Sequence, residues 1–345
     1  MSEIQFICVD CQELFMEETD KNCCTCGGLL IIKTSKSIFK DNWIVGENQT
    51  MWKYYLVVSV QANKRAWEKV SLGEGNTVLD KLDSDNQHIY LKLENTLPSQ
   101  SYIDRCSALL VTKLLEKKIQ NILITEATCM SLSVAKYAKH AQIACELALP
   151  ENTACQLVDA HRNEGVRVSD FVSDQESAAN NFILPDFHPY MIEGAKTYAY
   201  EIWEQLGHRH PDIVTFSVET SMLAVGTYYG FKDLLEHHLI GKLPRFIIVD
   251  IQSTSLPVKS KAVSIPQPLY KELIKMIKET DGHLQTITKT EIIQASKALF
   301  MRGYQIDEQS AAAYAGCMRY YRDFSIKNES IVIPLSNFSE IGKSK

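Results

Sequence analysis

Short apolar runs alternate with amphipathic patterns from residue 88 onward, and this alternation constrains the fold more than any other feature. Strand-like runs occupy 88–94, 121–127, 142–149, 212–219, 245–252 and 330–335, with helical patterns such as 101–118, 130–140 and 223–239 between them. Nearly continuous apolar strands separated by amphipathic helices favour parallel sheets covered on both faces. The sequence therefore predicts an α/β protein, in which ligands bind where strand-to-helix loops meet at the carboxyl ends of the strands.

The composition predicts a soluble globular protein. The chain has 345 residues, 45% of them hydrophobic and 23% charged, enough for two domains or one large α/β unit with an appendage. A net charge of -6 argues against nucleic-acid or basic membrane-surface binding. The sequence lacks an apolar run of about 18 residues and a signal-peptide pattern, so we expect a cytoplasmic protein without membrane partners.

Five of the ten cysteines lie within the first 26 residues. Cys8 and Cys11 form one C-x2-C pair, and Cys23 and Cys26 form a second, which precedes a glycine pair. Four thiolates at this spacing suit the tetrahedral coordination of structural zinc. Glycine after the second pair would let backbone N–H groups approach the sulfur atoms. We therefore predict that Cys8, Cys11, Cys23 and Cys26 bind zinc, with Cys24 as a bystander, in a module too short to form its own core.

Three segments carry a resemblance to a known family: "WKYYLVVSV" (52–60), "VSLGEGNTVLDKL" (70–82) and "HIYLKLENTLPSQSYIDR" (88–105). The sequence resembles threonine synthase and its relatives, which are pyridoxal-phosphate (PLP) enzymes of fold type II. The resemblance implies two parallel-sheet α/β domains with a cleft between them, usually in a homodimer. It places a zinc ribbon at 1–32 and the PLP fold type II region at 33–345, with a small domain at roughly 95–195 and the remainder as the large domain.

The first two cofactor-contacting places of that family are altered in this chain. Alignment of "PSQSYIDR" with the family pattern puts Ile103 at the position of the lysine that forms the Schiff base. Isoleucine offers neither a nucleophile nor a base. The loop that reads S-G-N in the family reads Ala127, Thr128 and Cys129 here, so its glycine and its amide donor are missing.

The other two places have lost their glycines. The phosphate-binding loop reads Glu219, Thr220, Ser221 and Met222, and the C-terminal T-G-x-G loop reads Ser336, Asn337, Phe338 and Ser339. Phosphate loops use glycine because backbone N–H groups must close on the anion. If Glu219 faces the phosphate, charge repulsion would weaken binding by roughly three decades.

These four departures predict a PLP-fold pseudoenzyme, a non-catalytic ligand-binding or scaffold subunit of an amino-acid-related or specialised biosynthetic pathway. It would act as a homodimer or as a heteromer with a pathway enzyme. Its cleft, which would take a small molecule, would be lined by Tyr102, Ile103, Thr128, Cys129, Glu219, Thr220, Ser221 and Ser336.

Two alternatives belong to the enzyme class. One is an active PLP-dependent lyase or synthase acting on an amino acid. The other is a PLP-independent enzyme that uses Cys129, because a helix N-terminus lowers the pKa of a thiol. The lysines Lys92 and Lys196 match family lysines other than the catalytic one, so we expect structural roles for them.

Overall fold

The computed structural model describes most of the chain. The described residues are 4–17, 22–33, 39, 43–46, 48–58, 64–82, 88–149, 156–170, 181–252, 265–324 and 328–337. Phe338 and Ser339 of the predicted C-terminal loop lie outside them.

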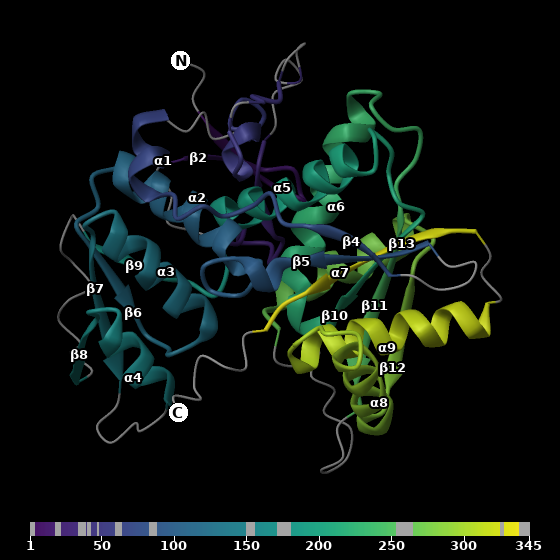
Figure 1. Cartoon of the computed structure of the whole chain (residues 1–345). Helices are drawn as coiled ribbons and strands as arrows, with labels where there is room; N and C mark the ends of the chain where they lie inside the picture. The colour runs from purple at the N-terminus through teal and green to yellow at the C-terminus, as the bar shows by residue number, and fades with distance from the viewer. Residues whose placement is uncertain are drawn as a thin grey trace.

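A six-stranded sheet forms the larger α/β layer (Figure 1). Its strand order is β12-β11-β10-β13-β5-β4, all parallel except β4, which pairs antiparallel with β5. The strands are β4 (Leu79–Leu82), β5 (His88–Leu93), β10 (Ile213–Ser217), β11 (Arg245–Ile251), β12 (His283–Ile287) and β13 (Ser330–Leu335). The chain thus returns to this sheet after building the second one.

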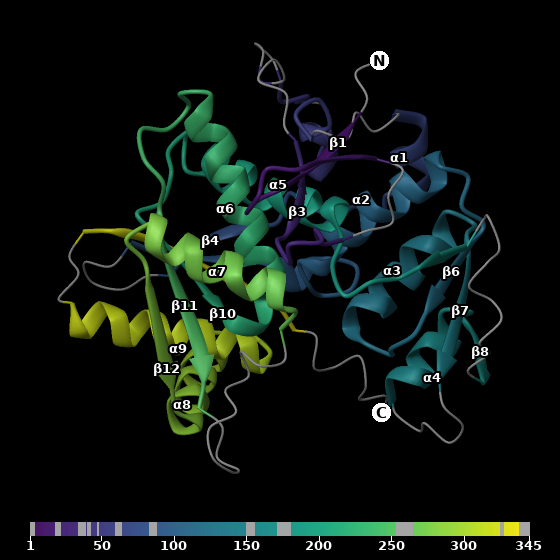
Figure 2. The same ribbon diagram turned by 180° about the vertical axis from the view of Figure 1, so that it is seen from behind.

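Both faces of the large sheet are covered, as the apolar runs predicted. Side chains alternate across a strand, so Ile247 packs with α8 (Lys289–Phe300) and α9 (Glu308–Asp323), whereas Phe246 and Ile248 pack with α6 (Ser221–Glu236) and α7 (Gln267–Glu279). The two views of the ribbon show these helix pairs on opposite sides of the sheet (Figures 1 and 2). This double covering explains why the central strands carry apolar side chains on both faces.

A four-stranded parallel sheet forms the second α/β layer, in the order β8-β7-β6-β9. Its strands are β6 (Asn121–Ile124), β7 (Ala144–Leu149), β8 (Arg167–Asp170) and β9 (Asn181–Ile183). The helices around it are α1 (Lys64–Val70), α2 (Ile103–Glu116), α3 (Cys129–His140) and α4 (Gln156–Asn163). The sheet falls within 95–195, although the exact division into domains remains a prediction.

The N-terminal module is a three-stranded antiparallel sheet in the order β2-β1-β3. It comprises β1 (Gln5–Cys8), β2 (Leu14–Met16) and β3 (Leu30–Ile32). Phe6 is fully buried and meets His188 and Tyr190 edge-on, at ring-centroid distances of 5.9 and 5.6 Å. The module therefore packs against α5 (Pro189–Gln205) and shares the core of the larger protein.

Helix α5 lies at the centre of the molecule and is buried over most of its length (Figure 2). It packs closely on α6, because a Cβ atom at Gly226 would lie 2.3 Å from the Cβ of Ala195. A Cβ at Gly194 would lie 2.2 Å from the backbone oxygen of Arg105, which brings α5 equally close to α2. Among the described residues, no helix combines the length and the apolar character needed to cross a bilayer.

The predicted strands are present at all six positions, within a few residues of the predicted bounds. The sequence did not reveal β12, because His283–Ile287 alternates between partly exposed and buried side chains and carries polar residues. It also did not reveal the antiparallel edge strand β4. Both strands lie at an edge of the large sheet, where the apolar signal is weakest.

Candidate functional site

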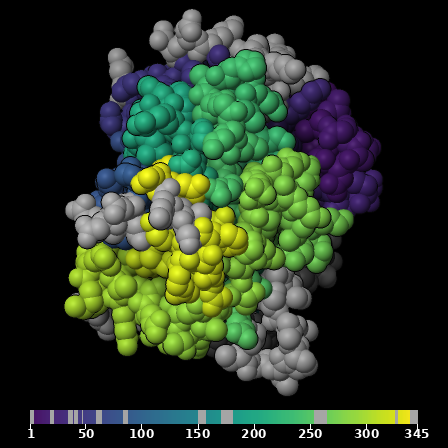
Figure 3. Space-filling view, turned by 90° about the vertical axis from the view of Figure 1, so that its right-hand side faces the viewer, coloured from purple at the N-terminus to yellow at the C-terminus, as the bar shows by residue number. Residues whose placement is uncertain are grey.

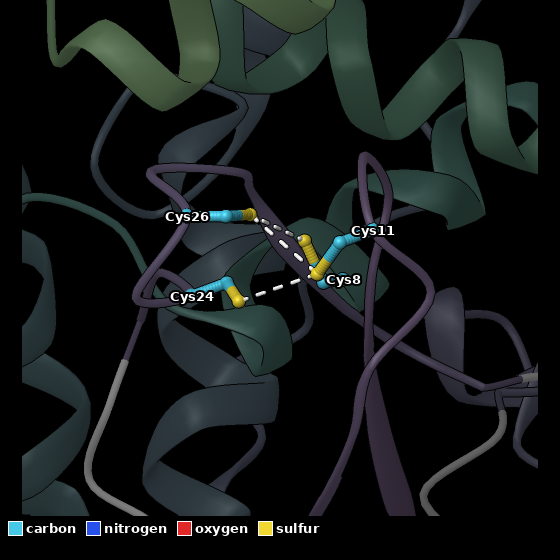
Figure 4. A group of neighbouring side chains, drawn as sticks. All are labelled: Cys8, Cys11, Cys24 and Cys26. Carbon is cyan, nitrogen blue, oxygen red and sulfur yellow. Dashed lines mark hydrogen bonds between the residues drawn. The ribbon is translucent and has the colours of Figure 1, made fainter.

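Four cysteines of the N-terminal module converge on one point (Figure 4). The sulfur atoms of Cys8, Cys11, Cys24 and Cys26 all lie within 4.8 Å of one another. The Cys8–Cys26 and Cys11–Cys26 sulfur distances are 3.5 Å, and the Cys11–Cys24 distance is 3.6 Å. Zinc bound at about 2.3 Å to four thiolates sets its ligands about 3.8 Å apart, so this cluster could hold a metal of that kind.

The structure corrects the predicted ligand set at one position, since Cys24 joins the cluster and Cys23 does not. Cys23 forms an isolated antiparallel bridge with Leu29 and packs partly buried against the core. Consecutive residues of an extended segment point to opposite sides, so the side chain of Cys24 turns toward Cys11 instead.

The glycine expected after the second cysteine pair is required for a steric reason at Gly28. A Cβ atom at Gly28 would lie 2.6 Å from the sulfur of Cys8 and 2.9 Å from a carboxylate oxygen of Asp10. The backbone N–H of Gly28 donates to the Cys26 sulfur, and this hydrogen bond is the main cause of a lowered pKa, about 7, for Cys26. A thiol that ionises near neutral pH is a ready metal ligand.

The residue that the sequence resemblance aligns with the family lysine is the first residue of α2. Ile103 begins that helix, is 9% exposed and belongs to the hydrophobic core. The next residue, Asp104, accepts hydrogen bonds from Ser99 N (2.6 Å) and from Ser133 Oγ (2.8 Å). Asp104 thereby fastens the preceding turn to α3.

Arg105 lies at the centre of a buried network of charges. Its guanidinium donates to Glu94 at 2.8 Å and to Glu201 at 3.0 Å, and Lys92 Nζ lies 2.5 Å from Glu201. All four side chains are fully buried. Burial raises the Glu201 pKa, but Arg105 and Lys92 lower it by more, so the carboxylate stays ionised. The network joins β5, α2 and α5 beneath the predicted site.

The loop before α3 is organised by a capping box. Thr128 caps the helix, its Oγ1 accepting a hydrogen bond from Ser131 N at 3.1 Å, and the Ser131 hydroxyl accepts one from Thr128 N at 2.9 Å. Cys129 is the first residue of the helix. Burial and the nearby charge of Asp307 raise its pKa to about 12, despite a backbone hydrogen bond that lowers it. The expected activation of Cys129 by the helix N-terminus is therefore outweighed.

The segment that replaces the phosphate loop is helical. Strand β10 ends at Ser217, a 3-10 turn (Val218–Thr220) follows, and α6 begins at Ser221. The Thr220 hydroxyl donates to Ser217 O at 2.8 Å, and Ser221 N donates to Val218 O, so the turn uses these groups internally. Glu219 is exposed at the tip of the turn and accepts a hydrogen bond from the Gln309 side chain.

The C-terminal position is tied to both neighbouring elements. The backbone oxygen of Ser336 accepts a hydrogen bond from Asp307 N at 3.0 Å, and Ser336 N donates one to Ser310 Oγ at 2.8 Å. Asn337 N donates to Gln100 O at 3.0 Å, which joins the end of β13 to the turn before α2.

The structure brings the four predicted places to one locality. Burial is the main cause of a raised Tyr102 pKa, and the groups whose charges add to it include Asp307, Cys129 and Glu219. Sequence reasoning missed Asp307, which caps α9 by accepting from Ser310 N at 2.8 Å. An aspartate directly before a helical pattern was the available signal.

The residues present do not fit PLP. Ile103 has no amine for the cofactor aldehyde, and in the turn after β10 the Ser221 N–H is bonded to Val218 O. Glu219, which the resemblance aligns with the family's phosphate loop, adds an exposed carboxylate to this turn. The nearest lysine on α3, Lys136, donates to Pro98 O at 2.7 Å.

The protein is built on two α/β sheets of mainly parallel strands, and its candidate site lies at the carboxyl ends of β10 and β13. The chain belongs to the family described as pyridoxal-phosphate dependent enzyme, whose model matches residues 70–337, and within it the chain is threonine synthase-like. It is 25% identical to threonine synthase of Methanosarcina acetivorans, covering 94% of this chain and 89% of the relative. It is 23% identical to that of Methanocaldococcus jannaschii, covering 94% and 90%.

Solved structures support the fold. Cysteine synthase from Entamoeba histolytica matches with a TM-score of 0.64 and 16% identity, over 82% of this chain and 91% of that one. A PLP-dependent aspartate racemase matches with the same TM-score and identity, over 81% and 95%.

Proposed function

We propose that this threonine synthase-like chain works without PLP, as a non-catalytic ligand-binding or scaffold subunit. It would pair with itself or with an enzyme of an amino-acid-related pathway, and its site would take a small molecule. The observation that carries this proposal is Ile103, an aliphatic residue packed in the core where the family keeps its lysine.

The other lysines near the site support the proposal, because each has a structural partner. Lys92 and Lys196 are fully buried, Lys92 with Glu201 and Lys196 with Glu193 at 3.0 Å and Asp233 at 2.9 Å. Burial lowers the Lys196 pKa, but its two carboxylates raise it by more. The amine of Lys196, kept charged in this way, does not condense with an aldehyde, since the neutral form is the nucleophile. Burial lowers the Lys92 pKa, so for Lys92 the argument rests on its full burial and its contact with Glu201.

The first alternative, an active PLP-dependent lyase or synthase on an amino acid with a β- or γ-leaving group, is favoured by the relatives named threonine synthase. The second alternative used Cys129 as a nucleophile. Its raised pKa of about 12 argues against it, because the thiolate is the reactive form.

Cofactor trapping tests the proposal. The purified chain is incubated with excess PLP, reduced with borohydride to fix any imine, and mapped by peptide mass spectrometry. We expect no adduct that saturates at one PLP per chain and no visible absorbance from bound cofactor. A saturating adduct on Lys92, Lys136 or Lys196, removed by changing that lysine to methionine, would overturn the proposal and favour the PLP-enzyme alternative.

The same preparation tests the scaffold role. Light scattering on the purified chain distinguishes a homodimer from a monomer, and a monomer would leave only the heteromeric arrangement. Turnover of O-phosphorylated amino acids by the chain alone, lost in Cys129→Ser, would instead support the Cys129 enzyme.

A further inference from the structure

A hollow lies at the amino ends of strands β5, β10 and β13, whereas the candidate site lies at their carboxyl ends. Its volume is about 630 Å³, within the range of small-molecule sites. It is bounded by the starts of three strands and by the turns that follow α5 and α6. The lining residues are His88, Tyr90, Leu206, His208, Arg209, His210, Asp212, Leu239, Ile240, Gly241, Lys242, Asn328 and Ser330.

Figure 3 looks onto this side of the molecule. The end of α5 in teal, the turn after α6 in green and the start of β13 in yellow lie next to one another there. Ligands of α/β proteins normally bind at the carboxyl ends of strands, where Glu219 and Ser336 lie. The hollow, at the amino ends, is therefore separate from the candidate site.

The fixed charges of the hollow are mainly positive. Arg209 and Lys242 are both exposed, and Asp212 is the single carboxylate among the lining residues. One Asp212 oxygen accepts hydrogen bonds from the backbone N and the Oγ of Ser330, both at 2.9 Å. The other lies 4.0 Å from Lys242 Nζ. Asp212 is thus largely committed within the wall, and it neutralises only one of the two cations.

Among the described residues, the hydrogen bond that Arg209 makes uses its Nε and not its two Nη atoms. Its Nε donates to Leu206 O at 3.3 Å, which anchors the side chain and leaves the two Nη groups for a ligand. A planar guanidinium recognises phosphate with two parallel hydrogen bonds.

Three imidazoles complete the polar wall: His88, His208 and His210. His210 Nδ1 lies 2.8 Å from Pro211 O, so Nδ1 carries the hydrogen and Nε2 is the free ring nitrogen. The His208 ring lies against Trp203, with ring centroids 4.5 Å apart and the planes tilted at 53°.

We propose that this hollow is a binding site for a small phosphorylated metabolite. Arg209 and Lys242 would hold the phosphate, assisted by the histidines. The remaining wall would contact the organic part, because Leu206, Leu239 and Ile240 are apolar and the volume exceeds that of a phosphate group. The site is independent of the proposed function, since it shares no residue with the positions that argue against PLP.

Calorimetric titration with O-phosphoserine and glycerol 3-phosphate tests the proposal, with succinate as a carboxylate probe. The double variant Arg209→Ala/Lys242→Ala is compared with Lys278→Ala/Arg302→Ala, which removes the same charge from exposed positions outside the lining. We expect the first variant to weaken phosphoester binding at least about tenfold and the second to leave it unchanged. Circular dichroism and thermal unfolding check that both variants fold.

Equal weakening in both double variants, tighter binding of succinate than of phosphoesters, or no binding at all would overturn the proposal. PLP bound here would be lost in the Arg209→Ala/Lys242→Ala variant, which separates it from an adduct trapped on Lys92, Lys136 or Lys196.

Discussion

Replacing Cys24 and Cys23 by serine, one at a time, tests the geometry of the metal cluster. The two residues are adjacent and the chemical change is identical, so each variant controls the other. The structure predicts that Cys24→Ser removes a metal ligand and that Cys23→Ser removes none.

The expected size of the effect follows from the sulfur positions. Cys24 Sγ lies 3.6 Å from Cys11 Sγ, close to the edge of about 3.8 Å in a tetrahedral zinc–thiolate site. Structural zinc contributes about 10–16 kcal/mol through four ligands, so one thiolate accounts for about 2.5–4 kcal/mol. Cys24→Ser should therefore weaken zinc binding by about two to three decades.

The assay is zinc competition against a chromogenic chelator, with zinc per chain measured after dialysis. Wild-type protein and Cys23→Ser should retain one zinc at chelator concentrations that strip Cys24→Ser. The N-terminal sheet should also lose protection from hydrogen exchange in Cys24→Ser, because Cys8 and Cys26 hold its loops together. Retention of zinc by Cys24→Ser together with its loss from Cys23→Ser would refute the geometry and restore the spacing-based ligand set.

Three further predictions concern the framework. Glu201→Gln removes the carboxylate that pairs with Lys92 and leaves that buried cation uncompensated, whereas Arg105 keeps Glu94. The variant should cost about 3–5 kcal/mol in urea unfolding, and Glu164→Gln, at an exposed ion pair, should cost under about 1 kcal/mol; equal costs would contradict this. Burial, aided by the charge of Lys117, lowers the His188 pKa to about 3. The neutral His188 ring therefore contributes its full share of stability above pH about 6.5, and the free energy of unfolding falls by up to about 5 kcal/mol as the pH drops toward 3. His188→Asn should flatten that dependence in unfolding titrations between pH 7 and pH 4. Gly194→Ala should overpack the contact between α5 and α2, which lowers the free energy of unfolding by about 1–3 kcal/mol and therefore lowers the thermal midpoint. An unchanged midpoint would show that α5 can move away from α2.

Much of the fold could be predicted from the sequence, because buried parallel strands need continuous apolar runs. Strands β5, β6, β10, β11 and β13 carry such runs. The metal ligands could not be assigned fully, since both Cys23 and Cys24 are at workable spacing from Cys26. Backbone pairing of Cys23 with Leu29 decides between them, and that pairing is not visible in the spacing.

The candidate site could be located only where local motifs mark it. Ile103 and Glu219 were placed by alignment with family motifs, and the structure puts both near Tyr102. Gln309 could not be foreseen, because it reaches Glu219 across 90 residues of sequence. Contacts of that range follow from the packing of α9 beside β10 and leave no local signal.

Residues that match the family pattern and residues that depart from it differ in how much stability a substitution would cost. Arg105 and Glu94 are fully buried and paired, so replacing either leaves an unpaired charge in the core whether or not the site is catalytic. Glu219 is exposed at a turn, and substitutions there alter the core little. Retention of the Asp104–Arg105 pair therefore reflects stability and carries no argument for PLP chemistry. The informative position is Ile103, because its aliphatic side chain packs in the core and has no amine for the PLP aldehyde.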